Sequence, residues 1–152
     1  MTGSVGKYLQ QLLEIHWLRP ETALWRAFDC LIMEKYGDIS GRAVDLGCGD
    51  GTMSFVMAGG TVDNYDVFMD VGDLQKYNAG ADIYNQNIKN HLTAKLDDLR
   101  YCFEWGVDHK EGLIEKAKRF APFYNNNLVL DLNQKIPFDD GYFDNAFSNI
   151  LY

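Results

Sequence analysis

The stretch that decides the fold is AVDLGCGDGT, which spans residues 43–52. Its first four residues form a short apolar run interrupted only by Asp45, and this run predicts a buried β-strand. Glycines alternate directly after the strand, at Gly47, Gly49 and Gly51. Residues 52–58 then predict a short helix. Because glycines let a ligand lie against the main chain, and open α/β folds bind ligands at the carboxyl ends of strands, this turn is the first candidate site.

Two helices are predicted before this stretch. Apolar residues recur at helical spacing over residues 5–16 and predict an amphipathic helix. Pro20 suits the first turn of a second helix, and Glu21 lies favourably near its positive end. We expect this second helix to stop near Gly37.

Strand-like and helical segments alternate again towards the C-terminus. Strands are predicted over residues 101–107, 128–130 and 143–150, with a helix over residues 110–121. This alternation predicts βαβ units, and hence an α/β domain with a mostly parallel sheet and helices on both faces.

Residues 61–99 interrupt the alternation and are rich in Asp, Asn and Tyr. A structureless loop of that length is uncommon in a compact domain, so we expect a partly helical insertion, with short helices over residues 71–77 and 91–99. Two interpretations remain open at this point. The insertion is either a surface excursion or an element that covers the site and shapes a substrate pocket.

Acidic residues stand at the ends of the predicted strands. Asp108 follows the second strand and is suited to accept two hydrogen bonds from ribose hydroxyls. Asp131 follows the third strand and is placed to accept a hydrogen bond from an exocyclic amine. Asp66 and Asp70 compete with Asp108 for the second position, but an apolar strand precedes Asp108 and a helix follows it, which favours Asp108.

Three segments together resemble the class I S-adenosylmethionine-dependent methyltransferases. Residues 43–52 resemble their first motif, and residues 106–118 (GVDHKEGLIEKAK) resemble their second strand and the helix after it. Residues 136–151 (IPFDDGYFDNAFSNIL) are similar to the segment around their fourth strand. The insertion and residues 19–28 are similar to methyltransferases found with surface-polysaccharide genes. The resemblance implies a Rossmann-like methyltransferase fold and methyl transfer from S-adenosylmethionine to a small-molecule or glycan-type acceptor.

The resemblance also implies a set of cofactor-binding residues. The residues around the methionine part of S-adenosylmethionine would be Asp45, Gly47, Gly49 and Gly51, with Cys48 in the same turn. The residues near the ribose and adenine would be Asp108, His109, Asp131 and Leu132. Ser148 and Asn149 would end near the transferable methyl group. We add Arg26 of the second helix as a partner for the cofactor carboxylate, because an acidic chain still needs a cation there.

The family's fold passes through three further strands, which are not present here. The resemblance therefore implies one incomplete domain over residues 1–152, with N-terminal helices (1–40), a cofactor-binding core (41–60 and 100–152) and the insertion (61–99). In the family's order the third, second, first and fourth strands lie side by side. We expect the fourth strand to self-associate through its free edge, as in a homodimer, or to be covered by the N-terminal helices.

The composition of the chain limits the classes of partner that it is expected to bind. The formal net charge is −8, and an acidic chain repels the phosphate backbone that supplies most nucleic-acid affinity. The cysteines Cys30, Cys48 and Cys102 form no CxxC pair, which argues against a disulfide framework and a zinc site and favours a reducing cytoplasm. No apolar run approaches the roughly 20 residues that span a bilayer. We therefore expect no nucleic-acid, membrane or metal partner.

Two other functions remain possible on this sequence. A nicotinamide-dependent oxidoreductase would need a glycine where Thr52 stands, because its pyrophosphate meets the helix N-terminus. A non-catalytic binding or assembly module could use the same fold. No catalytic base is assigned, although His91 is a candidate if the acceptor needs one.

Overall fold

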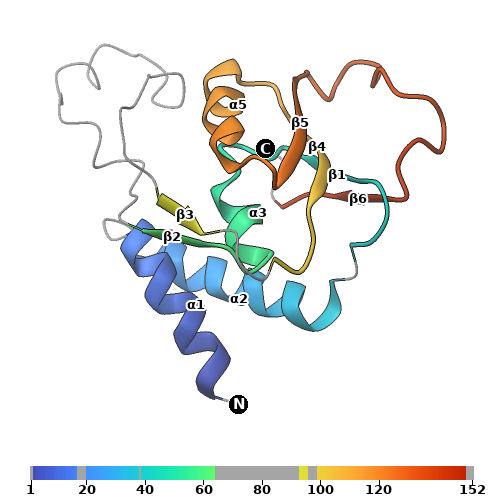
Figure 1. The fold of residues 1–152 in the computed structure, drawn as a ribbon. Helices are drawn as coiled ribbons and strands as arrows, with labels where there is room; N and C mark the ends of the chain where they lie inside the picture. The colour runs from blue at the N-terminus through green and yellow to red at the C-terminus, as the bar shows by residue number, and fades with distance from the viewer. Residues whose placement is uncertain (1, 17–19, 38, 64–92, 96–98, 150–152) are drawn as a thin grey trace, which may run out of the picture.

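The computed structural model describes residues 2–16, 20–37, 39–63, 93–95 and 99–149. The helices are α1 (Thr2–Ile15), α2 (Pro20–Tyr36), α3 (Thr52–Met57), α5 (Glu111–Ala117) and the short 3₁₀ helix η2 (Lys118–Phe120). The strands are β1 (Ala43–Leu46), β2 (Thr61–Asp63), β3 (Thr93–Lys95), β4 (Phe103–Asp108), β5 (Tyr124–Val129) and β6 (Asn145–Phe147). Figure 1 shows their arrangement.

The domain is built on a four-stranded parallel sheet in the order β5-β4-β1-β6. Val44 of β1 lies between Trp105 of β4 and Ala146 of β6. This order is the one expected for the third, second, first and fourth predicted strands. The structure thus confirms an α/β layout that is compatible with a Rossmann-like fold.

The predicted third strand was placed too late in the chain. It begins at Tyr124 rather than at residue 128, although three asparagines, which are poor strand formers, follow Tyr124. Glu104 of the neighbouring strand satisfies two of them. Asn125 donates a hydrogen bond to the Glu104 carboxylate (3.0 Å), and Asn126 donates one to the Glu104 backbone carbonyl (3.1 Å). This cross-strand pairing is invisible to a local pattern.

The two other late strands are shifted by smaller amounts. β4 begins and ends slightly later than residues 101–107, and β6 covers only residues 145–147 of the predicted 143–150. Within the described residues β6 pairs with β1 alone. Residue 150 lies outside the described residues, and association through this edge stays a prediction.

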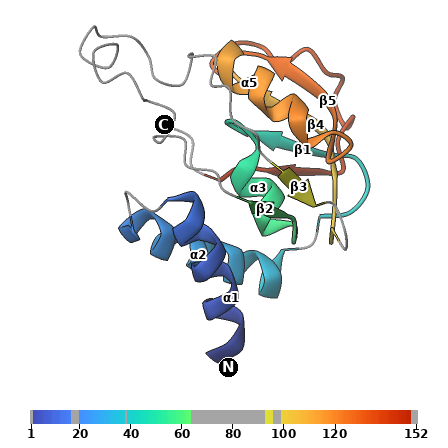
Figure 2. The same ribbon diagram turned by 60° about the vertical axis from the view of Figure 1, so that its left-hand side comes forward.

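Helices cover one face of the sheet in the described part of the chain. α5 packs against β4 and β5, and right-handed crossovers place α3 and α5 on the same face. β5 connects to β6 through residues 130–144, which contain turns and bends but no helix. The expectation of helices on both faces is therefore wrong for the described residues, because Pro137, Gly141 and several acids leave this connection without a helical apolar stripe. Figure 1 shows the connection as a long irregular path, and Figure 2 shows α3 between the sheet and the N-terminal helices α1 and α2.

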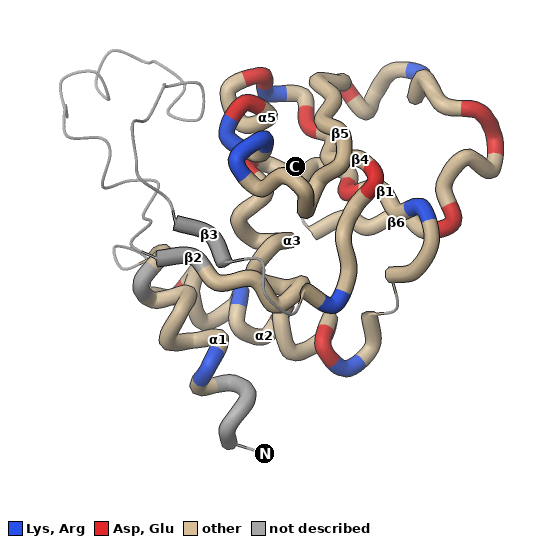
Figure 3. The backbone as a smooth tube through the Cα atoms, viewed as in Figure 1, with Lys and Arg blue, Asp and Glu red and all other residues tan. Residues whose placement is uncertain are grey.

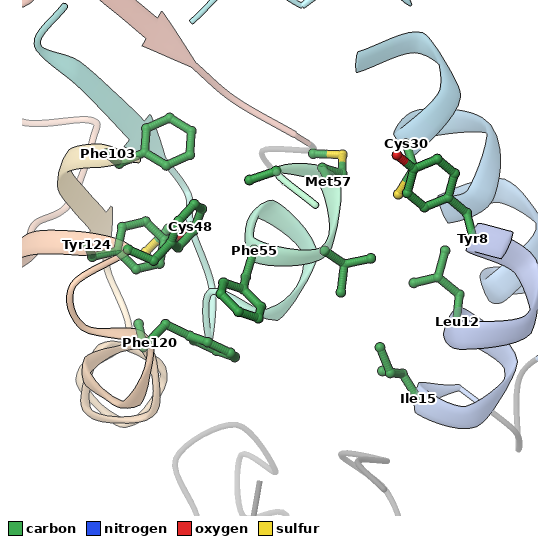
Figure 4. Packing of buried hydrophobic residues seen from close by; sticks show 14 of the residues in the cluster. Tyr8, Leu12, Ile15, Cys30, Cys48, Phe55, Met57, Phe103, Phe120 and Tyr124 are labelled. Carbon is green, nitrogen blue, oxygen red and sulfur yellow. The ribbon is translucent and has the colours of Figure 1, made fainter. Parts of the chain in front are cut away.

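The core is organised around α3, which is almost wholly buried. Phe55, Val56 and Met57 of this helix have no exposed surface. Figure 4 shows aromatic side chains of β4, η2 and β5 on one side of α3 and side chains of α1 and α2 on the other. Arg100 secures the far end of α3 by donating hydrogen bonds to the carbonyls of Met57 and Ala58. α3 thus joins the sheet to the N-terminal helices.

The insertion starts and ends in a two-stranded antiparallel sheet. β2 and β3 pair with Thr61 opposite Lys95. The prediction of a helix over residues 91–99 is wrong where β3 lies, because Thr93–Lys95 is extended and paired. The helix predicted over residues 71–77 lies outside the described residues, as do Asp66, Asp70 and His91.

Candidate cofactor site

The glycine turn, residues 47–51, connects the carboxyl end of β1 to α3. Its three glycines all adopt positive φ, a conformation that other residues rarely take. The amides of Gly47 and Cys48 both donate hydrogen bonds to the carbonyl of Val107 in β4, at 2.8 Å and 3.0 Å. The turn is therefore tied to the neighbouring strand at the carboxyl edge of the sheet.

Gly51 packs on aromatic rings beneath the turn. A Cβ atom at this position would lie 2.7 Å from Tyr124 Cε2 and 3.1 Å from Phe120 Cδ2. Both distances are shorter than ordinary carbon contacts. Gly51 is thus required by packing as well as by its φ of 81°.

Gly49 faces the opposite way, into open space. A Cβ atom at Gly49 would meet no atom within 4 Å, although the residue has a φ of 59°. Its amide donates a hydrogen bond of 3.0 Å to Oδ2 of Asp108. The open space beside Gly49 and the carboxylate of Asp108 therefore lie next to each other.

Asp108 ends β4 and is only 7% exposed. Besides the amide of Gly49, it accepts a hydrogen bond from the amide of Lys110 at 2.9 Å, through Oδ1. A carboxylate has about four lone-pair positions, so Asp108 retains acceptor capacity for ligand hydroxyls. The side chain predicted to bind ribose thus lies beside the turn predicted to bind the methionine part.

Asp45 lies beneath the turn rather than at its surface. The side chain is buried, and its Oδ2 accepts a hydrogen bond of 2.7 Å from the hydroxyl of Tyr124. Burial raises the pKa of Asp45 to about 6, while hydrogen bonds from Ser54 and Tyr124 oppose the rise and the negative charge of Asp108 adds to it. Asp45 supports the site from below in this conformation.

Tyr124 is the residue that sequence reasoning missed. Its ring packs against Gly51 and Gly106, and its hydroxyl bonds Asp45. The signal was present, because Phe123 and Tyr124 form an apolar pair before the asparagine run. Starting the third strand at residue 128 left this pair unassigned.

The residues predicted to face adenine lie at the carboxyl ends of β4 and β5. The amide of Leu130 donates a hydrogen bond of 2.9 Å to the carbonyl of Asp108, which brings the two strand ends together. Nδ1 of His109 lies 3.4 Å from Oδ1 of Asp108, and the His109 ring is largely exposed. Asp131 accepts hydrogen bonds from the amide and the side chain of Asn133, and these lower its pKa. Leu132 follows in the same turn, half-buried.

A small cavity of about 160 Å³ opens at the carboxyl end of β6. It is lined by side chains from α2, the end of α3 and the end of β6, namely Asp29, Ile32, Met33, Met57, Phe147, Ser148 and Asn149. Asn149 Nδ2 lies 3.8 Å from the Met57 sulfur. The two residues predicted near the methyl group therefore line a mostly apolar cavity with one carboxylate, Asp29.

Arg26 is already paired within its own helix. Its Nη1 lies 3.2 Å from Oδ2 of Asp29, and the side chain is partly buried. Contact with a cofactor carboxylate would need Arg26 to exchange or share this partner, so its predicted role stays a prediction.

Cys48 does not supply a reactive thiol. It is 7% exposed, and burial raises its pKa, with the negative charges of Asp45 and Asp108 adding to the rise. The thiol therefore stays protonated near neutral pH. Among the described residues no three His, Cys, Asp or Glu side chains gather as metal ligands.

Comparisons with known proteins give no assignment for this site. The chain matches no protein-family model, and neither the curated proteins nor the solved structures provide a match. The helices in the described part of the chain are too short or too polar to cross a membrane.

Proposed function

We propose that this protein binds S-adenosylmethionine at the glycine turn and transfers its methyl group to a small-molecule or glycan-type acceptor. The observation that carries the proposal is the hydrogen bond between the Gly49 amide and Asp108, with open space above Gly49. This bond brings a stretch of main chain without a side chain next to a carboxylate that can accept hydrogen bonds from ribose hydroxyls. Both lie at the carboxyl edge of a parallel sheet, where α/β folds bind ligands.

The residues present fit this cofactor. Gly49 would allow close approach of the methionine part, and Asp108 would accept hydrogen bonds from the ribose hydroxyls. The carboxylates of Asp45 and Asp108 together would favour a cation at the turn. S-adenosylmethionine supplies a methyl group already activated on a positively charged sulfur.

The protein's own contribution would be alignment and exclusion of water. The cavity at the end of β6 is the candidate place for the acceptor, because Ser148 and Asn149 line it. Its carboxylate, Asp29, is the one acid among the lining residues and is paired with Arg26, so it could orient an acceptor hydroxyl or amine by accepting a hydrogen bond from it. The net charge of −8 supports an acceptor other than nucleic acid.

The structure gives less support to a nicotinamide cofactor. Such a fold places a pyrophosphate on the N-terminus of the helix after β1. Here α3 has six residues and begins with a buried threonine, Thr52, where the dinucleotide fingerprint has glycine.

Calorimetric titration of the Gly49→Val variant tests the proposal. A branched side chain at Gly49 would fill the open space and weaken binding of S-adenosylmethionine and its demethylated product at least tenfold. Gly141→Val is the matched control, because Gly141 also has positive φ (74°) and open space around its Cβ position. Equal affinity in the parent and Gly49→Val would refute the site, and binding of a nicotinamide cofactor instead would refute the choice of cofactor. A methyl-transfer assay then separates an enzyme from a binding module.

A further inference from the structure

The outward face of α2 carries large apolar side chains that no described residue covers. The exposed members are Leu24 (41%), Trp25 (68%), Phe28 (44%), Ile32 (57%) and Tyr36 (71%). The opposite face of α2 is buried through Ala23, Ala27 and Cys30. Contiguous exposed apolar surface of this kind marks interaction sites in soluble domains.

These residues form one stripe along the helix. Positions 24, 28 and 32 are four residues apart, and positions 25 and 36 lie next to position 32 around the helix, so all project within about one third of the helix circumference. The rings of Trp25 and Phe28 already contact each other, with centroids 6.2 Å apart. We call this stripe, with the charged residues at its ends, the α2 face.

The α2 face is self-complementary about Phe28. Glu21 lies in the first turn of α2 and Lys35 in the last, each seven residues from Phe28 and both exposed. Leu24 and Ile32 are each four residues from Phe28. An antiparallel copy of the helix would therefore place Phe28 against itself, Leu24 against Ile32 and Glu21 against Lys35.

We propose that two copies of this chain associate through their α2 faces, with the helices antiparallel about a two-fold axis near Phe28. Charge complementarity favours a second copy of the chain as the partner of the α2 face, because a two-fold pair joins the acidic end of each stripe to the basic end of the other. Lys35 Nζ lies over the ring of Tyr36 (4.8 Å), which keeps this charge at the α2 face. The surface adjoins the cavity at the end of β6, because Ile32 belongs to both. The association is argued from the apolar stripe and the charges at its ends, and it does not rest on the proposed methyl transfer.

Sedimentation equilibrium over a range of concentrations tests the proposal. The parent chain should show a reversible dimer, and Phe28→Glu should raise its dissociation constant at least tenfold because two carboxylates would meet on the axis. Ile136→Glu is the matched control, since Ile136 is an exposed apolar residue (38%) outside α2, and it should leave the dimer unchanged. Circular dichroism checks that each variant is folded. A parent chain that stays monomeric, or a dimer that Phe28→Glu leaves intact, would overturn the proposal.

Charge exchange at the exposed ends gives a second test that does not disturb packing. Glu21→Lys and Lys35→Glu should each weaken the dimer about twofold to thirtyfold, because the two-fold axis creates two such exposed ion pairs and each substitution breaks both. The double variant should recover the parent dissociation constant. Within one chain the two positions are about 21 Å apart along the helix axis, so only pairing between chains explains recovery. Failure to recover would overturn the antiparallel arrangement.

Discussion

A glycine-rich turn follows β1 and an acidic loop follows β5, and the protein holds their acidic residues in opposite ways. The glycine turn (residues 47–51) rests on buried aromatic rings and on the buried side chain of Asp45. The acidic loop (residues 131–141) is largely exposed, and its first acid, Asp131, is held by hydrogen bonds from Asn133, two residues away. Both segments contain residues predicted to bind the cofactor. Long-range packing lies directly under Gly51, whereas in the acidic loop it reaches Phe138, whose ring packs on Trp105 of β4 with centroids 5.1 Å apart, and Asp131 is held by its neighbour Asn133.

The acids of the two segments also differ in their pKa shifts. Burial raises the pKa of Asp45, while local hydrogen bonds lower that of Asp131. Figure 3 shows acidic residues along the connection that contains the acidic loop, and both acidic and basic residues on α5. The acids of the exposed loop are thus solvated, whereas Asp45 is stabilised only by its protein partners.

The largest expected effect is on stability. Gly51→Ala should destabilise the protein by about 3–4 kcal/mol, because it adds a close contact with the Tyr124 ring to the strain of a left-handed backbone. Gly141→Ala in the acidic loop has the same sign of φ and open space, so it should cost only about 1–2 kcal/mol. Urea denaturation of both variants measures the difference. Equal destabilisation would remove the distinction between the turns.

The second effect concerns pH. The folded-state pKa of Asp45, about 6, lies above its unfolded value, so the folded state binds the proton more tightly and loses stability as pH rises from about 4 to 6. Asp45→Asn should remove this loss, which amounts to about 2–3 kcal/mol at pH 7. The measurement is the free energy of unfolding of both proteins at pH 4.5, 5.5 and 7.

Asp131→Asn serves as the control for that pH profile. The pKa of Asp131 is lowered in the folded state, so its contribution is present above the unfolded pKa and lost only as pH falls below it. The variant should keep the parent's loss of stability between pH 4.5 and 7. A profile for Asp45→Asn that matches the parent would show that Asp45 does not carry the effect.

The smallest effect compares the two acids in cofactor binding. Asp108→Ala should weaken binding of S-adenosylmethionine at least tenfold, since a charged acceptor of two hydrogen bonds is removed. Asp131→Ala should weaken it about threefold, because it removes one exposed hydrogen bond. Calorimetry provides both affinities, with unfolding curves run in parallel. If Asp70→Ala lowered the affinity for S-adenosylmethionine and Asp108→Ala did not, the acid that binds ribose would lie in the insertion.

Much of the candidate site could be predicted from local patterns. The first strand was placed at residues 43–46, where β1 lies, and α3 begins at the predicted Thr52. Asp108 was placed at the end of a strand, and it ends β4. These features depend on the residues' own neighbours, because an apolar run, alternating glycines and a following helix are local requirements of the backbone.

Other features depended on residues far away in the sequence. The start of β5 depends on Glu104, which satisfies asparagines that would otherwise disfavour a strand. The strand β3 depends on its pairing with β2 across the insertion. The missing helix between β5 and β6 reflects a connection that crosses the sheet as an irregular chain.

The sequence by itself therefore determined the order of the elements outside the insertion, the parallel sheet and the position of the glycine turn at its carboxyl edge. The tertiary structure decided what each acid does there. Asp45 and Tyr124 meet although they are 79 residues apart, and their contact buries one acid beneath the turn while Asp108 keeps acceptor capacity beside it. Local periodicity specifies which face of an element is apolar, but only packing of the whole domain selects the side chain that fills the space behind it.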